Sequence, residues 1–332
     1  MLNVFSKLTK GQFFSFKLLI IGIVVLILLF APSYLSRYYL YLVTLILVTV
    51  LFATSLNIPL GYGGLLVLHQ ATFYGVGAYA FAIFLKQGTL PILPASLIAP
   101  LIAAAFACFI GWICVRLRGL YFSFLTLAMG QLVWAIIYRW YNFTGGDDGI
   151  HAIPVPDFLR SGSSVFYTTL IVVLISLLLI YIIVKSPYGL TLQAVRDNPQ
   201  RCESVGINIR NHRLIAFVMG GFFAGVAGVL FVLLERSVAP PMLFWTKSVE
   251  VLIMVLLGGM FTFLGPAFGA VVVIGMMTFF GIFTEYWLLF LGSIKILLLL
   301  FLPQGVLGYI EEMMAKSAKK IEKGEERGYA QG

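Results

Sequence analysis

Residues that could perform catalysis or bind a metal ion are few and scattered in this sequence. The three histidines are His69, His151 and His212, and no H-E-x-x-H or G-x-S-x-G pattern sets any of them beside a second reactive group. Asp147 and Asp148 are adjacent, so they do not present a stacked carboxylate pair on a regular element. No G-x-x-x-x-G-K-[ST] phosphate loop occurs, and the dipeptide Gly-Lys is absent. The sequence therefore predicts no metal site, no nucleophile triad and no ATP site of its own.

A second group of polar residues stands inside long apolar segments, where their burial is costly and therefore informative. His69 and Gln70 lie near the start of one such segment, and Gln131 lies in the middle of another. Glu250 lies near the end of a third, where it could serve a substrate ammonium group or simply pair with Lys247. We interpret His69, Gln70, Gln131 and Glu250 as candidate residues of a solute pathway.

Membrane helices are the elements that must position these residues. The chain has 332 residues, of which 61% are hydrophobic and 11% are charged, whereas soluble proteins average roughly 45–50% and 25%. A helix needs about 20 mostly apolar residues to cross a bilayer core. The fold class is therefore predicted as all-α, a polytopic membrane protein with about ten spans. The predicted spans are 18–31, 38–56, 65–85, 94–115, 120–140, 165–184, 213–234, 248–262, 265–283 and 286–302.

Glycine and proline interrupt the apolar segments at two places, residues 57–64 and 258–269. Pro59 and Pro266 favour broken helices there, and irregular backbone at membrane depth is tolerated mainly where it lines a cavity or is buried in protein. The glycine spacing of residues 221–228 instead predicts close helix packing. Four residues of the second break join the predicted pathway: Gly258, Gly259, Gly265 and Pro266.

Positive charge predicts the orientation, because cytoplasmic loops of membrane proteins carry the excess of Lys and Arg. If the N-terminus is inside, most of the 22 Lys and Arg residues fall on inner segments. Residues 1–17 and 309–332 are then cytoplasmic ends, and residues 18–308 form the transmembrane domain. Residues 1–35 could also be a signal peptide, but a retained helix is favoured because no A-x-A-like site follows the apolar run.

One long polar loop, residues 185–213, is predicted to fold on the cytoplasmic side. Ser186-Pro187-Tyr188-Gly189 should end the preceding span, and LTLQAVRD should then form two helical turns. Asn198-Pro199 is a good helix start, with asparagine as N-cap and proline as first residue. Gly206 should end the second short helix in a left-handed conformation.

The same loop is predicted to dock a partner protein. Leu192, Val195 and Val205 would place apolar side chains on a surface that no bilayer covers, which favours a docking element over a solvated connector. The positions that we assign to ATPase coupling are Ser186, Gly189, Val195, Arg196, Asp197, Asn198, Glu203 and Gly206.

Six segments together resemble one transporter family. The run SPYGLTLQAVRDNPQRCESVGIN resembles the cytoplasmic coupling loop of the branched-chain amino acid ABC permeases, in particular the LivM-type subunit. Five other runs agree with that family in the same order: LLVLHQATFYGVGAYA, RLRGLYFSFLTLAMGQ, TGGDDGI, SVEVLIMVLLGGMFTFLGPAFGA and FLPQGVLG. His69 departs from the family, which usually has a glycine immediately before the residue that corresponds to Gln70.

The resemblance implies a non-enzymatic permease in the plasma membrane of a prokaryote, surrounded by membrane lipid. It implies a homologous second permease subunit of the LivH type, two ATP-binding subunits and an extracytoplasmic solute-binding protein. This chain would bind no cofactor, since ATP and Mg²⁺ would be held by the partner subunits, and its net charge of +9 needs no nucleic acid partner. The cargo implied is a branched-chain or other apolar amino acid. Urea or an aromatic carboxylate stays open, as does an ion-coupled secondary transporter, which would be expected to hold more intramembrane carboxylates.

Overall fold

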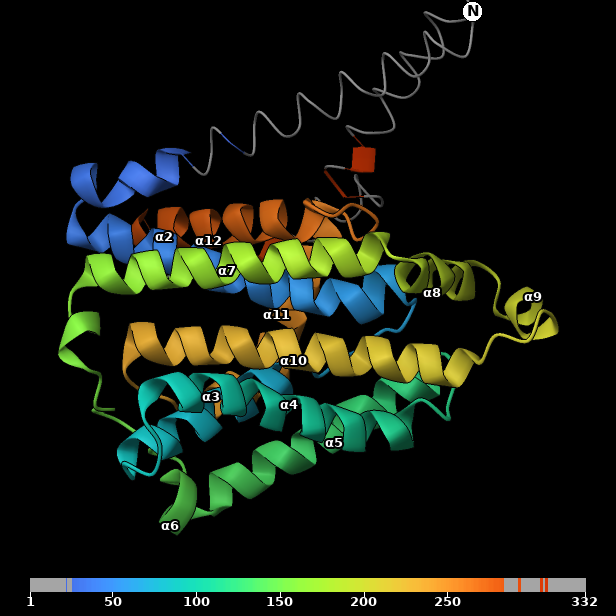
Figure 1. Cartoon of the computed structure of the whole chain (residues 1–332), viewed down its shortest axis with the longest axis horizontal. Helices are drawn as coiled ribbons and strands as arrows, with labels where there is room; N and C mark the ends of the chain where they lie inside the picture. Colours follow the sequence, from blue (N-terminus) through green and yellow to red (C-terminus); the bar gives the residue numbers. More distant parts are fainter. Residues whose placement is uncertain (1–21, 23–25, 284–291, 294–304, 307, 310–332) are drawn as a thin grey trace, which may run out of the picture.

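The protein is an all-α polytopic membrane protein, and its long helices lie side by side (Figure 1). The computed structural model describes residues 22, 26–283, 292–293, 305–306 and 308–309. Within this part of the chain, five helical segments are long and apolar enough to cross a membrane: Arg37–Tyr62, Ile92–Cys114, Leu120–Arg139, Gly162–Lys185 and Ile209–Glu235. Shorter apolar helical segments complete the bundle, at Ala71–Lys86 and Gly265–Gly281.

Residues 26–34 are helical and precede the labelled helices. The α-helices follow in the order α2 (Arg37–Asn57), α3 (Ala71–Lys86), α4 (Ile92–Cys114), α5 (Leu120–Arg139), α6 (Tyr141–Thr144), α7 (Gly162–Lys185), α8 (Pro187–Asp197), α9 (Pro199–Ser204), α10 (Ile209–Glu235), α11 (Trp245–Gly258) and α12 (Gly265–Phe283). A π-helical turn, η1 (Ile58–Tyr62), extends α2, and two 3₁₀ turns lie at η2 (Asp157–Leu159) and η3 (Pro240–Leu243).

Six predicted spans correspond to helices whose ends differ by only a few residues: α2, α4, α5, α7, α10 and α12. The span predicted at 65–85 is wrong at its start, because residues 65–70 are not helical and α3 begins at Ala71. The span predicted at 248–262 is a shorter helix, α11, which ends at Gly258. The prediction at 286–302, half of that at 18–31, and the two predicted cytoplasmic ends lie largely outside the described residues, while residues 26–31 of the first span are helical.

Helix α10 lies at the centre of the bundle and packs against α2, α3 and α4. Small residues make this close packing possible, as the spacing of residues 221–228 predicted. A methyl group added at Gly228 would lie 2.0 Å from the carbonyl oxygen of Tyr74, and one added at Gly225 would lie 2.6 Å from the methyl carbon of Ala103. Without a large hydrophobic driving force between membrane helices, such close backbone approach supplies much of their association energy.

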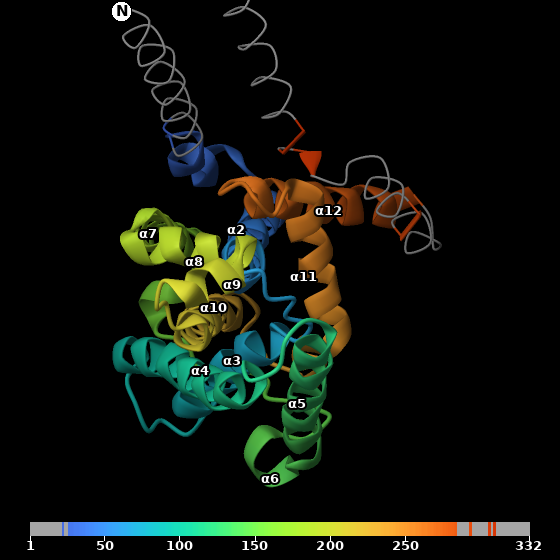
Figure 2. The ribbon, with the colours of Figure 1, turned by 90° about the vertical axis from the view of Figure 1, so that its right-hand side faces the viewer.

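Helix α11 is oriented differently from the other long helices. Figure 2 looks along the bundle, with α7 and α10 seen nearly end-on, while α11 is seen from the side and runs between α5 and α12. Its first half contacts the start of α3, where the hydroxyl of Ser248 accepts a hydrogen bond of 2.9 Å from the backbone N–H of Ala71. Helix α11 therefore connects the α5 side of the molecule to the α2–α12 side.

At the end of the bundle away from α8 and α9, residues 144–150 form a tight turn. Gly145, Gly146 and Gly149 of the TGGDDGI motif all have positive φ, which glycine adopts without steric cost. Two backbone hydrogen bonds, of 2.8 and 2.9 Å, join Ile150 to Val238 in an isolated antiparallel bridge. The turn is thereby fixed to the connection that follows α10.

Candidate functional site

The polar loop folds into two short helices, α8 and α9, which we name the platform (Figure 1). The hydroxyl of Ser186 accepts the N–H of Gly189 at 3.3 Å, and the side-chain oxygen of Asn198 accepts the N–H of Arg201 at 3.0 Å. Gly206 has a φ of 84°, which is the left-handed conformation that was predicted. The predicted cap at Asn198 and the predicted left-handed Gly206 are therefore confirmed, and Ser186 is an N-cap that was not predicted.

The start of the first platform helix differs from the prediction. Residues 186–189 do not form an extended break, because Ser186 alone separates α7 from α8 and Pro187 is the first residue of α8. Gly189 lies inside the helix, where an added methyl group would be 2.3 Å from the carbonyl oxygen of Val184. The glycine allows α8 to turn back closely against the end of α7.

The apolar side chains of the platform are divided between the bundle and the surface. Leu192 is 2% exposed and belongs to the main core, and Val195 is fully buried beside Cys202 and Ile209. The prediction that Leu192 and Val195 are exposed to a partner is therefore wrong, because both side chains attach the platform to its own bundle. Val205, by contrast, is 71% exposed at the end of α9.

A tyrosine also fixes the platform to the central helix. The hydroxyl of Tyr188 donates a hydrogen bond of 2.8 Å to the carbonyl oxygen of His212 near the start of α10, and the two rings stack. Burial raises the pKa of the Tyr188 phenol well above its ordinary value, so the hydroxyl remains protonated and keeps donating. The first platform helix and α10 are thus joined by a polar contact as well as by apolar packing.

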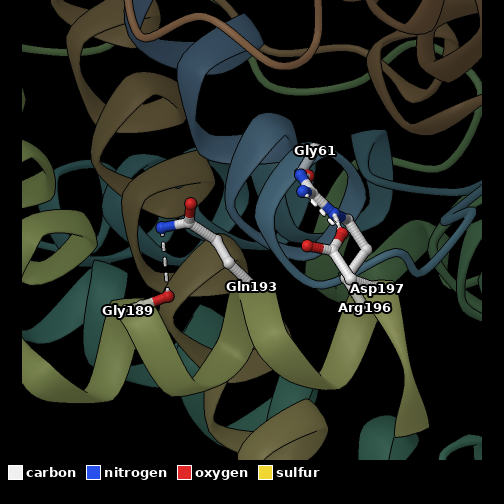
Figure 3. Close-up of polar contacts among 5 residues, drawn as sticks. All are labelled: Gly61, Gly189, Gln193, Arg196 and Asp197. Carbon is white, nitrogen blue, oxygen red and sulfur yellow. Dashed lines mark hydrogen bonds and ion pairs between the residues drawn. The ribbon is translucent and has the colours of Figure 1, made fainter.

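Arg196, at the far end of α8, contacts both predicted helix breaks. Figure 3 shows its contacts with Gly61 and Asp197. Its Nη1 donates a hydrogen bond of 2.7 Å to the carbonyl oxygen of Gly61, in the π-helical turn that ends the α2 segment. Its guanidinium lies 5.0 Å from the centre of the Phe261 ring, in the connection between α11 and α12. Asp197 pairs with the same guanidinium at 2.8 Å and holds it in place.

The backbone around Arg196 is shaped to admit this side chain. Gly64 has a φ of 66°, and a methyl group there would lie 2.7 Å from Cγ of Arg196. A side chain at Gly61 would meet the carbonyl oxygen of Met260 at 2.1 Å, so the two breaks touch each other directly. Both glycines are therefore needed where the platform meets the breaks.

The first break lies further along the chain than was predicted. Helix α2 does not end at Pro59 but continues as the π-helical turn to Tyr62, and residues 63–70 form the irregular segment. The wider turn accommodates the proline ring, and the carbonyl oxygen of Pro59 accepts the N–H of Leu65 at 2.9 Å. The prediction of a break at Pro59 is therefore wrong by a few residues.

The second break lies where it was predicted, at residues 259–264 between α11 and α12. Gly259 has a φ of 115°, and an added methyl group at Gly258 would lie 1.7 Å from the carbonyl oxygen of Gly265. Pro266 is the second residue of α12, where its missing N–H costs no helical hydrogen bond.

Gln70 ends the first break deep inside the bundle and is fully buried. Its Nε2 donates a 2.9 Å hydrogen bond to the carbonyl oxygen of Gly220 on α10, and lies 3.3 Å from the hydroxyl of Ser55. Its Oε1 is buried without a hydrogen-bond partner among the described residues. The Oε1 atom of Gln70 is therefore a buried hydrogen-bond acceptor that is left unsatisfied.

His69 precedes Gln70 and is 2% exposed. Its Nδ1 is hydrogen-bonded to the hydroxyl of Thr72, and its Nε2 is buried without a partner in the described structure. The imidazole ring packs against Gly130 of α5, where a methyl group would lie 2.1 Å from the ring. Gln131 is the next residue of α5 and is half-buried, so the structure brings His69, Gln70 and Gln131 into one region.

Glu250 lies apart from this region, near the start of α11. Its carboxylate pairs with Lys247 at 2.9 Å, and its side chain is 19% exposed. The sequence left open whether Glu250 serves a substrate or pairs with Lys247, and the structure contains the ion pair. Among the described residues, no group of three or more His, Cys, Asp and Glu side chains could hold a metal ion.

Comparison with known proteins identifies the family. The model of the family described as "Branched-chain amino acid transport system / permease component" matches residues 38–300. The chain belongs to this permease family. It is 30% identical to the high-affinity branched-chain amino acid permease protein LivM of Escherichia coli over 318 residues, which cover 88% of this chain and 75% of that protein. LivM of Salmonella typhimurium is 29% identical over 346 residues, which cover 96% of this chain and 79% of the relative.

Shorter similarities reach other transporters. The guanosine permease protein NupQ of Bacillus subtilis is 30% identical over 66 residues, only 20% of this permease. No solved structure matches the permease. As a permease component of an ABC transporter, the chain is not itself an enzyme, and ATP is bound by partner ATPases.

Two residues of the permease's site were missed by sequence reasoning. Asn57 is fully buried, and its amide approaches the carbonyl oxygen of Thr262 at 3.5 Å, across the contact between the two breaks. Ser248 caps the start of α3 from α11. The signal for Asn57 was present, since an amide directly after a long apolar run and before a proline is costly unless it has a partner.

Proposed function

We propose that this chain is a permease subunit of an ATP-driven importer for branched-chain or similarly apolar amino acids. Its partners are a homologous second permease subunit, two ATP-binding subunits and an extracytoplasmic solute-binding protein. The platform receives an ATP-binding subunit, and the region of His69, Gln70 and Gln131 lies on the solute pathway. The family match and the LivM relatives support this assignment.

The contact of Arg196 with both helix breaks is the observation that carries the mechanism. An ATP-binding subunit that moves α8 pulls on the carbonyl of Gly61 and on the ring of Phe261 at the same time. The chain runs from Gly61 through the first break to His69 and Gln70, and Asn57 at the end of α2 contacts the second break at Thr262. A small displacement at the surface therefore reaches the buried polar region through directly contacting residues.

The charge distribution supports an orientation with both termini in the cytoplasm of a prokaryote. Helices α4 and α7 end, and α5 and α10 begin, at the same end of the bundle as the platform (Figure 1). The basic residues of these ends and of the platform are Arg116, Arg118, Lys185, Arg196, Arg201, Arg210 and Arg213. The positive-inside rule favours this end as cytoplasmic.

The relatives favour an amino acid as cargo. Those that match over most of the chain are named for branched-chain amino acid transport, whereas the guanosine permease protein matches over only a fifth of it. The region of His69 and Gln70 offers an imidazole and an amide with unsatisfied buried atoms, among mostly apolar buried residues. Such a region suits a small, largely apolar solute that carries a few polar groups.

Reconstitution into proteoliposomes with the neighbouring gene products tests the proposal. Uptake of leucine, isoleucine and valine should depend on internal ATP and on the binding protein, and should persist when an uncoupler dissipates ion gradients. ATP hydrolysis should rise when the binding protein carries its ligand. Uptake that an uncoupler abolishes while ATP is maintained would instead identify an ion-coupled transporter. ATP-dependent uptake of urea or an aromatic carboxylate, without uptake of the amino acids, would refute the proposed cargo but not the ATP-driven mechanism.

A further inference from the structure

A hollow beside the platform is lined by four arginines that the transport mechanism does not use, together with Glu203 and Gly206 of the predicted coupling positions. It has a volume of ≈ 660 Å³ and lies where α4 ends, α5 begins and α10 begins, beside the end of α9. We name it the basic hollow. Its lining residues are Val115, Arg116, Arg118, Glu203, Gly206, Ile207, Asn208, Ile209, Arg210 and Arg213.

The basic hollow has an excess of positive charge that the described chain does not neutralise. Four arginines line it and Glu203 is its one carboxylate, yet none of the four arginines forms an ion pair with any described residue. The guanidinium of Arg118 repels that of Arg213, and Nε of Arg213 is buried without a hydrogen-bond partner in the described structure. Arg213 is half-buried, whereas the other three arginines are exposed at the rim of the hollow. Converging guanidinium groups without a carboxylate partner favour a bound anion, which supplies both charge and acceptors.

Two of these arginines are held in position at the end of α4. The guanidinium of Arg116 lies 4.2 Å from the centre of the Trp112 ring, and Nη2 of Arg210 donates a 3.3 Å hydrogen bond to the carbonyl oxygen of Trp112. These contacts fix the two cations at the edge of the hollow before any ligand arrives. A ligand anion therefore meets donors that need little reordering.

An exposed apolar stripe on α4 leads to the basic hollow. Leu101, Ala105, Phe109 and Trp112 follow one face of the helix at helical spacing, and Arg116 continues that face. Leu101, Phe109 and Trp112 are 57%, 64% and 53% exposed. Because α4 is long and apolar enough to cross the membrane, and tryptophan favours the membrane interface, the hollow opens at the level of lipid headgroups.

We propose that the basic hollow binds the phosphate headgroup of an anionic glycerophospholipid, such as phosphatidylglycerol, with an acyl chain along the stripe of α4. A phosphodiester bonds well to converging arginines, and basic pockets between membrane helices are suited to anionic headgroups. The combination of unpaired guanidiniums with an adjoining membrane-facing apolar stripe favours a lipid over an acidic surface of a partner protein, which would need only the charges. The lipid would lie directly against the end of the platform.

Lipid retention by the purified full chain tests this site. Native mass spectrometry would compare dioleoyl phosphatidylglycerol with dioleoyl phosphatidylcholine, which has the same acyl chains and no net charge. We expect preferential retention of the anionic lipid. Arg116→Gln and Arg213→Gln should each lower that retention about fivefold, the factor that corresponds to the typical attraction of one basic residue to an anionic membrane surface. Arg201→Gln, which removes the same charge from the exposed face of α9 outside the hollow, should leave retention unchanged.

Three results would overturn the proposal. Equal retention of the two lipids would mean that the hollow does not select an anion. Displacement of phosphatidylglycerol by glycerol phosphate or inorganic phosphate at comparable concentration would identify a site for a free phosphate. Unchanged lipid retention in Arg116→Gln, together with weaker capture of the ATP-binding subunits, would assign the arginines to that protein interface. Arg116 is exposed, so its variant should fold even if Arg213→Gln does not.

Discussion

Replacement of Arg196 by glutamine should separate ATP hydrolysis from uptake. The glutamine keeps a polar side chain on α8 but is shorter and uncharged, so it cannot both reach the carbonyl oxygen of Gly61 and cover the ring of Phe261. Platform packing should survive, because Leu192 and Val195 hold α8 on the bundle and neither contact involves the guanidinium. The variant therefore removes the link between the platform and the breaks while the platform itself remains folded.

The size of the effect follows from the two contacts. A hydrogen bond from a charged donor contributes about 1.5–3 kcal/mol, and a cation–π contact contributes about 0.5–1 kcal/mol at exposed sites. The Arg196 side chain is 22% exposed and is shared with Asp197, so we take the low end of the sum, about 2 kcal/mol. If this energy couples the platform to the breaks, its loss lowers the coupling constant by roughly 30-fold.

The assay is the number of substrate molecules taken up per ATP hydrolysed in proteoliposomes that contain the complete transporter. Basal ATP hydrolysis should stay near that of the unmodified protein, and its stimulation by the loaded binding protein should largely disappear. Arg201→Gln is the matched control, since Arg201 is exposed on α9 and its described hydrogen bonds involve only backbone atoms. Arg196→Lys should recover part of the ratio, because it restores the charge without the planar group.

An unchanged ratio of uptake to hydrolysis in Arg196→Gln, at normal expression and assembly, would refute the reasoning. The contact with Gly61 and Phe261 would then be structural, and the ATP-binding subunits would act on the pathway through another element. Loss of both hydrolysis and assembly would also contradict it, since that outcome would make Arg196 a docking residue.

Three further predictions concern helix packing, cargo specificity and the ion pair between Lys247 and Glu250. Gly228→Ala should lower the melting temperature of the purified chain, because its methyl group would lie 2.0 Å from the Tyr74 carbonyl oxygen and overpacking costs about 1–3 kcal/mol; Gly275→Ala, with open space around it, should not. His69→Gly should change the relative KM values of different cargo molecules while subunit assembly is retained, and an unaltered order of preference would exclude His69 from selectivity. Glu250→Gln should weaken uptake if Glu250 contacts the cargo. Assembly should survive, because the half-buried pair with Lys247 contributes no more than about 1 kcal/mol to stability. Normal uptake kinetics would assign Glu250 a structural role only.

Local signals in the sequence were sufficient to predict that the platform consists of two short helices. Its helices are capped by Ser186, Asn198 and Gly206, and each cap acts over only three or four residues. Helix ends of this kind can therefore be predicted from the local sequence. Proline at position 59 gave a misleading signal, because the cost of its missing N–H depends on whether a wider helical turn can form. That outcome is decided by packing against other helices, which a local pattern does not contain.

Long-range contacts account for what the sequence could not predict. Arg196 and Gly61 are 135 positions apart, and Asn57 and Thr262 are 205 positions apart. The apolar residues of the polar loop at 185–213 were recognised as needing burial, but hydropathy does not say whether the bundle or a partner provides it. For Val195 the bundle provides it, and for Val205 no described residue does.

Helix α10 has one further consequence for how the two faces of the transporter communicate. It begins beside the platform, where Tyr188 bonds to it, and the residues directly after its end form the bridge to the TGGDDGI turn. Its 27 residues span about 40 Å, and its close contacts with α3 and α4 leave little space for bending. In the proposed orientation, the turn at residues 144–150 faces the solute-binding protein, and α10 is a stiff helix whose opposite end contacts the platform. If that orientation is correct, we expect a loaded binding protein that presses on this turn to displace the platform end of α10 before its cargo enters the pathway.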